Sequence, residues 1–155
     1  MDDTIADDRA DALIERCGYA AAALGLLPLP GTEIIAVMPL HVGMVVALGD
    51  LYEVPLSRES AAELLMQIGG AVGVSVVGSR LAMTAAKTLL PGFGGLITAP
   101  LLYGTTLGLG AVARAWFACG GRLDPGAMRR TYRSAKRRAR FHGDRSTETE
   151  PTAAP

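Results

Sequence analysis

The stretch LLPGFGGLITAPLLYG, residues 89–104, places proline and glycine between two apolar runs. Pro91 cannot continue a helix, because its ring removes a backbone donor and clashes with the preceding turn. The glycines tolerate the positive φ angles of a tight reversal. The stretch therefore predicts the turn of an apolar helical hairpin, made by Pro91, Gly92, Gly94 and Gly95.

The same glycines do not fit a phosphate-binding loop. Such a loop has the pattern GxxxxGK[ST], whose lysine and hydroxyl hold phosphates and magnesium. Here the Lys87-Thr88 pair precedes the glycines instead of following them. A dinucleotide-binding pattern, GxGxxG, begins at Gly92, but Ile97 stands where the third glycine belongs. We therefore expect no nucleotide cofactor.

Apolar residues recur at helical spacing along most of the chain. The pattern predicts an all-α fold, a bundle of about five helices that includes the apolar hairpin. The helices are expected over residues 5–27, 32–51, 58–90, 96–113 and 124–141.

Three features mark the expected helix ends and irregularities. Pro39 falls inside the second helix and should kink it. Ser60 and Glu63 have the spacing of a capping box at the start of the third helix. Asp124 and Pro125 form an N-cap and N1 pair that should begin the last helix.

The chain divides into four expected segments. Residues 1–14 form an acidic helix start, and 15–121 form the main helical domain. Residues 122–141 form a basic amphipathic helix. Residues 142–155 are rich in Gly, Ser, Thr, Glu and Pro, which is typical of a disordered tail.

The formal net charge of +0 conceals an uneven distribution of charge along the chain. Acidic residues crowd the first fifteen positions, and the middle is almost uncharged. Basic residues crowd the last predicted helix, which indicates contact with an anionic surface or an acidic partner; a solvated face without a partner is the alternative. These residues are Arg129, Arg130, Arg133, Lys136, Arg137, Arg138 and Arg140.

No residue pattern predicts catalysis. Glu33 and His41 share a helix face, but eight residues separate them by about 12 Å along the axis. We interpret them as a polar pair at a helix interface. The serine-hydrolase pattern GxSxG is absent. Cys17 and Cys119 lack metal-ligand spacing, so neither a metal site nor an enzyme is expected.

The apolar middle of the chain contains recurring small residues and a few cations. The segment 96–113 is a candidate transmembrane helix at the short end of the length that a span needs. Arg80 and Lys87 share one helix face and are expected to contact a partner or headgroups. Trp116 lies where an interfacial anchor would, although a buried core position is the alternative. Two GxxxG pairs predict close helix packing: Gly69 with Gly73, and Gly104 with Gly108.

Three segments together resemble the YcjF/DUF697 domain family. They are LLPLPGTEIIAVMPLHVGMVVALGDLYEVPLS at 26–57, AAELL at 61–65 and KTLLPGFGG at 87–95. The resemblance covers roughly residues 15–121. Its matching positions are Pro28, Pro30, Gly31, Glu33, Pro39, the segment 87–94 and Gly108.

The resemblance implies a bacterial, membrane-associated helical module without a catalytic motif. The family often occurs beside or fused to P-loop GTPases, so a separate GTPase is an implied partner. His41 stands where the family would have a glutamine, which puts a polar role at that position in doubt.

Two functional classes follow from these observations. The first is a non-enzymatic module at the cytoplasmic face of the cytoplasmic membrane, an adaptor or regulator for a separate GTPase. Its 61–118 hairpin and basic helix would engage anionic lipids. The alternative is a soluble all-α homo-oligomer that packs through its Gly/Ala-rich helices. Nucleic acid is not an expected partner, because no DNA- or RNA-reading motif frames the basic residues.

Overall fold

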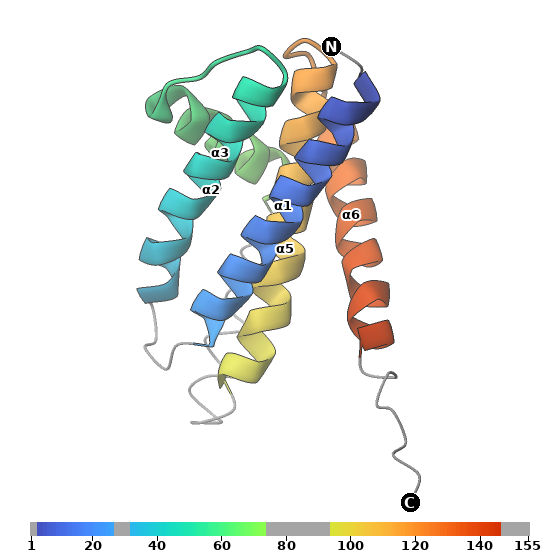
Figure 1. Cartoon of the computed structure of the whole chain (residues 1–155). Coiled ribbons are helices and arrows are strands. Elements are labelled where there is room, and N and C mark those ends of the chain that lie inside the picture. The colour runs from blue at the N-terminus through green and yellow to red at the C-terminus, as the bar shows by residue number, and fades with distance from the viewer. Residues whose placement is uncertain (1–2, 27–31, 74–93, 147–155) are drawn as a thin grey trace, which may run out of the picture.

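The computed structural model describes residues 3–26, 32–73 and 94–146. In these residues the chain forms helices and no strand, so the predicted all-α bundle is confirmed (Figure 1). The helices are α1 (Asp3–Gly25), α2 (Thr32–Leu51), α3 (Arg58–Val72), α5 (Gly94–Ala118) and α6 (Pro125–Ser146).

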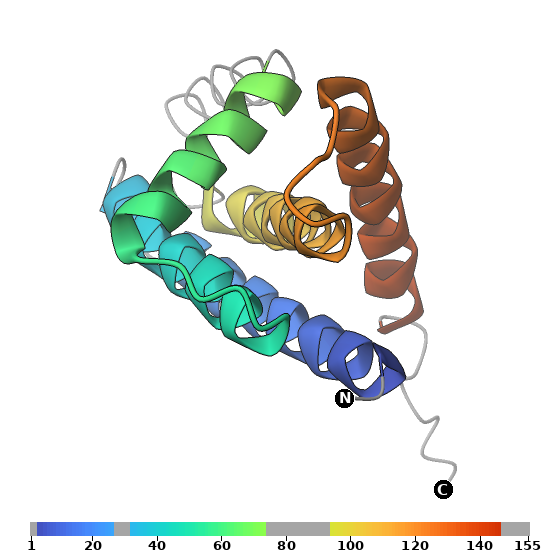
Figure 2. The ribbon, with the colours of Figure 1, turned by 90° about the horizontal axis from the view of Figure 1, so that it is seen from above.

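Helix α5 is the centre of the bundle. It contacts α1, α2, α3 and α6, and its most extensive packing is against α1. Figure 2 shows α5 seen almost end-on, with α1 and α2 along one side, α3 along another and α6 along the third. Helix α3 closes the bundle by touching both α2 and α6.

The hydrophobic core lies where α2, α3 and α6 meet around α5. All five helices contribute buried side chains, and most of them are aliphatic. The arms of the predicted hairpin, α3 and α5, therefore bury apolar side chains inside the bundle. The most buried members are Ala10, Met44, Val45, Leu48, Ala61, Ile68, Val112 and Ala113.

Two helix starts show how side chains fix the boundaries. Asp124 caps α6 as predicted, because its Oδ1 accepts from the amides of Gly126 at 2.8 Å and Ala127 at 3.0 Å. For α3 the predicted capping box at Ser60 is wrong. Ser57 is the N-cap, and its hydroxyl accepts from the Ser60 amide at 3.2 Å.

Several predicted boundaries differ from the observed ones. Helix α3 ends at Val72, where a glycine-rich run lowers helix propensity, and the remainder of the helix predicted to residue 90 lies outside the described residues. Helix α5 begins at Gly94, so Gly94 and Gly95 lie in its first turn, not in the predicted turn. Pro91 and Gly92 lie outside the described residues. Helix α6 continues to Ser146, past the expected start of the tail.

None of the described helices combines the length and the apolar composition that crossing a bilayer requires. The transmembrane segment predicted at 96–113 is therefore corrected. Helix α5 contains this segment, but its glycines and threonines dilute the apolar residues.

Two helices end in Schellman motifs. After α5, Gly120 adopts a φ of 62°, and the Gly121 amide donates to the Trp116 carbonyl at 2.9 Å. After α2 the same left-handed position is taken by Glu53, with a φ of 59°. The Val54 amide then donates to the Gly49 carbonyl at 2.8 Å. A residue with a Cβ in this conformation is strained by about 1 kcal/mol.

Replacing Glu53 by glycine should therefore raise the free energy of unfolding by about 1 kcal/mol. Urea denaturation would show this as a higher midpoint with an unchanged slope. Asp50→Gly is the matched control, because it also removes a carboxylate but lies within α2, where glycine destabilises a helix. Equal loss of stability in both variants would contradict strain at Glu53.

Candidate functional site

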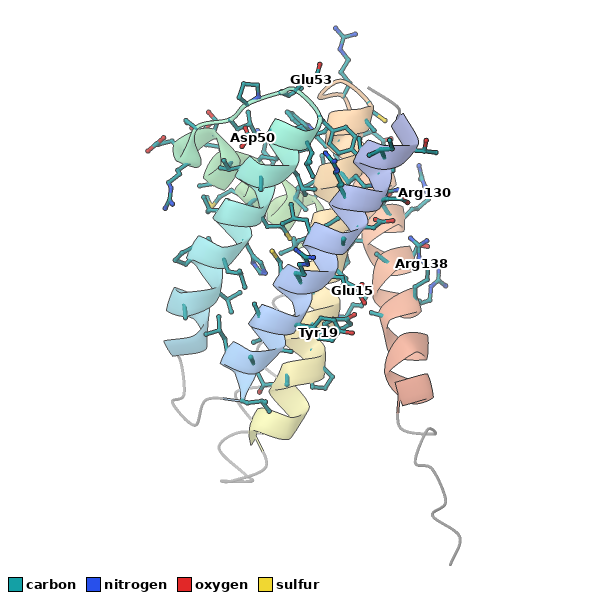
Figure 3. The ribbon with its side chains drawn as sticks, in the orientation of Figure 1. Glu15, Tyr19, Asp50, Glu53, Arg130 and Arg138 are labelled. Atoms are coloured by element: carbon teal, nitrogen blue, oxygen red, sulfur yellow. The ribbon has the colours of Figure 1, made fainter. Side chains whose placement is uncertain are left out.

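Helix α6 separates an apolar stripe from a basic face. Met128, Tyr132, Ala135 and Ala139 are buried at helical spacing and point into the bundle. The arginines lie on the opposite side and are exposed, and Figure 3 shows Arg130 and Arg138 on the outer side of α6. We define the basic face as Arg130, Arg133, Arg137 and Arg138.

Two of the three other cations of the predicted cluster pack against the bundle, and the side chain of the third, Arg140, lies outside the description. Arg129 Nε donates to the Ala71 carbonyl at 2.6 Å, in the last turn of α3. A cation at this end of a helix also complements its dipole. The Lys136 ammonium lies 5.8 Å from the centre of the Tyr132 ring, and its stem lies near Gly104. Arg129 and Lys136 therefore have roles within the fold.

Arg129→Met should lower the free energy of unfolding by about 1 kcal/mol, because it removes a charge-assisted bond between α6 and α3. Arg130→Met is the matched control on the adjacent residue, which belongs to the basic face. We expect thermal denaturation to show a lower Tm for Arg129→Met than for Arg130→Met. Indistinguishable Tm values would mean that the Ala71 contact contributes nothing.

No carboxylate among the described residues forms an ion pair with the basic face. The acidic start of α1 is instead tied to α5. Arg114 Nη1 pairs with Asp11, and Arg114 Nε lies 3.9 Å from Asp7 Oδ1. Tyr52 at the end of α2 donates its hydroxyl to Asp7 at 2.5 Å. The polar contacts thus join α1, α2 and α5, and leave Arg133, Arg137 and Arg138 of α6 for an external anion.

Partial burial raises the pKa of Tyr52, and its hydrogen bond to Asp7 and the negative charge of Asp7 raise it further. An unfolded tyrosine ionises near pH 10, so the folded state keeps its proton where the unfolded state loses it. This stabilisation is complete below pH 10 and is lost as the pH rises above it.

Tyr52→Phe should make the loss of stability above pH 10 less steep than in the wild type. Two other tyrosines also have raised pKa values, Tyr103 at about 12 and Tyr132. They contribute equally to the pH dependence of stability in both proteins. Urea denaturation between pH 8 and 12, a range that spans the ordinary tyrosine pKa of about 10, would measure the difference. Parallel stability curves would contradict the assignment.

Of the predicted polar pair, the structure describes the side chain of His41 but not that of Glu33. His41 is buried, and its Nε2 lies 2.9 Å from the Thr106 hydroxyl oxygen. The imidazole thus joins α2 to the middle of α5. Glu33 lies in the first turn of α2, and its side chain falls outside the description. The pairing of Glu33 with His41 therefore stays a prediction.

The four predicted packing glycines have different surroundings. A Cβ at Gly108 would lie 2.6 Å from two carbons of the Tyr132 ring, and one at Gly104 would lie 3.6 Å from Lys136 Cγ. Both glycines therefore face α6 of the same chain. A Cβ at Gly69 would meet nothing within 4 Å, and one at Gly73 would meet its own helix.

Sequence reasoning missed the closest helix contact, between α1 and α5. A Cβ at Gly18 would lie 2.5 Å from Leu107 Cδ1, and one at Gly110 would lie 2.6 Å from Ile14 Cγ2. Gly18 stands alone in its helix pattern, so GxxxG spacing could not indicate it. The sequence signal for this contact was Gly110, two residues after Gly108. It places a second glycine on another face of α5.

The other predicted contact residues lie away from the basic face or outside the description. Trp116 is half-buried, packs edge-on against Phe117 at 5.1 Å and covers Gly121. Arg80 and Lys87 are outside the described residues. In the described ranges, no group of three or more His, Cys, Asp or Glu side chains could hold a metal ion.

A family model described as "Domain of unknown function (DUF697)" matches residues 3–114. The chain belongs to the DUF697 family. The match begins earlier than the resemblance at 15–121 suggested, so the acidic start of α1 is part of the family domain.

Among curated proteins, the DUF697 chain is similar to Magnetosome membrane protein 22 of Magnetospirillum gryphiswaldense (strain DSM 6361 / JCM 21280 / NBRC 15271 / MSR-1). The two are 30% identical over 131 residues, which cover 80% of this chain and 67% of the relative. No solved structure matches the chain.

Proposed function

We propose that this DUF697 chain is a non-enzymatic, membrane-associated helical module that binds anionic lipid headgroups through the basic face of α6. One observation carries the proposal. The apolar stripe of α6 is buried in the bundle, while Arg130, Arg133, Arg137 and Arg138 are exposed, and Arg133, Arg137 and Arg138 form no ion pair with a carboxylate among the described residues. Backbone hydrogen bonds lower the pKa of Asp124 at the start of α6, and the charge of Arg130 helps to lower it.

The expected strength of this contact follows from the charge of the surface. Each Lys or Arg near an anionic membrane contributes about 1 kcal/mol, and salt screens the attraction. The basic face would therefore supply about 4 kcal/mol in total at physiological ionic strength. Such an interaction is reversible, as expected for a module that binds at the bilayer surface.

Two further facts support this function. The relative from Magnetospirillum gryphiswaldense is named as a membrane protein, although its name says nothing of how it is attached. In addition, the leaflet that faces the cytoplasm is the anionic one in most cells, so the basic face favours the cytoplasmic side of the cytoplasmic membrane.

Sedimentation with lipid vesicles tests the proposal. The full chain should pellet with vesicles of phosphatidylglycerol and phosphatidylcholine, and should remain in the supernatant with phosphatidylcholine alone. Raising the salt concentration should release it. Equal binding to both vesicle types, or no binding to either, would contradict a headgroup contact made by the arginines.

We further propose that the module is an adaptor or regulator for a separate P-loop GTPase. This part rests on the family resemblance. It is tested by measuring GTP hydrolysis by a GTPase encoded beside this chain, with anionic vesicles and with or without the chain. A rate or vesicle recruitment that changes with the chain supports the partnership, and an unchanged rate and distribution refute it.

A further inference from the structure

At one end of the bundle, the described parts of α1, α2 and α5 carry almost no charge. This end is formed by the last turns of α1 and the first halves of α2 and α5, which Figure 1 shows side by side. Between Arg16 and Asp50 the sequence has one charged residue, Glu33, and residues 94–113 have none. We call this the charge-free end.

Large apolar side chains are exposed at the charge-free end. Leu26 at the end of α1 is 57% exposed, and Met38 in α2 is 42% exposed. Next to Met38, Pro39 is also exposed. Helix α2 therefore exposes apolar side chains as well as burying them. A helix whose outer side faces only water usually carries polar residues on that side.

A tyrosine pair marks the boundary of this end. Tyr19 on α1 is 61% exposed and lies 5.1 Å from Tyr103 on α5, measured between ring centres. The Tyr19 hydroxyl donates to Glu15, one turn nearer the charged part of the molecule, at 3.4 Å. Paired tyrosines with an apolar side and a hydrated side are typical of a membrane interface.

The charged residues follow in order along the bundle axis. Figure 3 shows that Tyr19 lies closest to the charge-free end, followed by Glu15 and Arg138 and then by Arg130. Asp50 and Glu53 lie at the opposite end. Arg130 and Arg138 of the basic face are thus nearer the middle of the molecule than Tyr19 is.

From this order we infer that the charge-free end is a membrane-insertion tip, which enters the headgroup and upper acyl region of an anionic bilayer. The arginines of α6 then lie at the level of the phosphates, and Tyr19 and Tyr103 lie at the interface. This inference rests on the proposed function, because it states how the same module is oriented on lipid. An apolar surface seated in this way penetrates about 5–10 Å.

The opposite end also exposes two apolar side chains, Ile5 at 48% and Val54 at 40%, but these stand beside charged residues, Asp7 and Glu53 among them. Trp116, the single tryptophan of the chain, packs there against the turn at Gly121 after α5. Helix α3 contacts the first half of α6 through Arg129 and Ala71, which places α3 away from the charge-free end. Its Met66 is 74% exposed and so provides an apolar reference site outside the proposed tip.

Fluorescence quenching by brominated lipid tests the orientation. Trp116→Phe removes the native signal, and a tryptophan is then introduced by Leu26→Trp in one variant and by Met66→Trp in the other. Vesicles contain phosphatidylcholine and phosphatidylglycerol in equal amounts, with bromine on the acyl chains. Sedimentation of both variants with the same vesicles is measured in parallel.

The Leu26→Trp variant should lose fluorescence and shift its emission to the blue, whereas the Met66→Trp variant should change little. Vesicle-bound protein without quenching of the Leu26→Trp variant would overturn the insertion tip and leave the headgroup contact intact. Failure of both variants and of the wild type to sediment with vesicles would overturn both proposals. A blue shift that depends on protein concentration without lipid would assign this end to a contact between copies, and so overturn insertion.

Discussion

Gly108→Val is expected to lower the free energy of unfolding by about 2–3 kcal/mol, the cost of overpacking a well-packed core. A Cβ at Gly108 already lies 2.6 Å from two ring carbons of Tyr132, and valine adds two methyl groups to it. The Tyr132 ring is rigid and 2% exposed, so it cannot move aside without separating α6 from α5. Chemical denaturation followed by circular dichroism would measure the loss.

Gly69→Val is the matched control. A Cβ at Gly69 meets nothing within 4 Å, and valine has a slightly higher helix propensity than glycine. This variant should be as stable as the wild type or slightly more stable. If the two substitutions destabilised the protein equally, Gly69 and Gly108 would have equivalent surroundings. That result would contradict the close packing of α5 against α6 at Gly108.

Replacing Arg133, Arg137 and Arg138 together by glutamine is expected to weaken binding to anionic vesicles roughly 100-fold. Each arginine near an anionic surface contributes about 1 kcal/mol, so three contribute about 3 kcal/mol. These side chains are exposed and have no ion-pair partner among the described residues, so the fold should be unaffected. Vesicle sedimentation over a range of lipid concentrations would measure the change.

A second triple variant, with Arg9, Arg58 and Arg122 replaced by glutamine, controls for net charge. These arginines are also exposed, but Arg9 lies on α1, Arg58 on α3 and Arg122 between α5 and α6. The control should bind vesicles much more tightly than the α6 variant. Similar weakening by both would show that overall charge, and not the basic face, determines binding.

The fold class was predictable because its signals are local. Helical periodicity and the Asp124 cap each depend on neighbouring residues, and the resulting all-α bundle is confirmed. The burial of Met128 and Tyr132 agrees with the amphipathic helix predicted over residues 122–141. Boundaries were less predictable, since Ser57 and Ser60 both have the chemistry of a cap and only backbone geometry distinguishes them.

The tertiary roles were not predictable, because they depend on residues far apart in the chain. Arg129 looked like any other arginine of the basic cluster until its contact with Ala71 placed it inside the fold. No local pattern indicated that Arg114 pairs with Asp7 and Asp11, which lie about a hundred residues earlier in the chain. Sequence spacing also could not show that Gly104 and Gly108 face α6 of the same chain.

Fractionation of cells that express the full chain tests membrane association most directly. The wild type should be found in the membrane pellet at low salt, and the variant with Arg133, Arg137 and Arg138 replaced should move to the supernatant. The control with Arg9, Arg58 and Arg122 replaced should stay with the membranes. Recovery of the wild-type chain entirely in the low-salt supernatant would contradict the account.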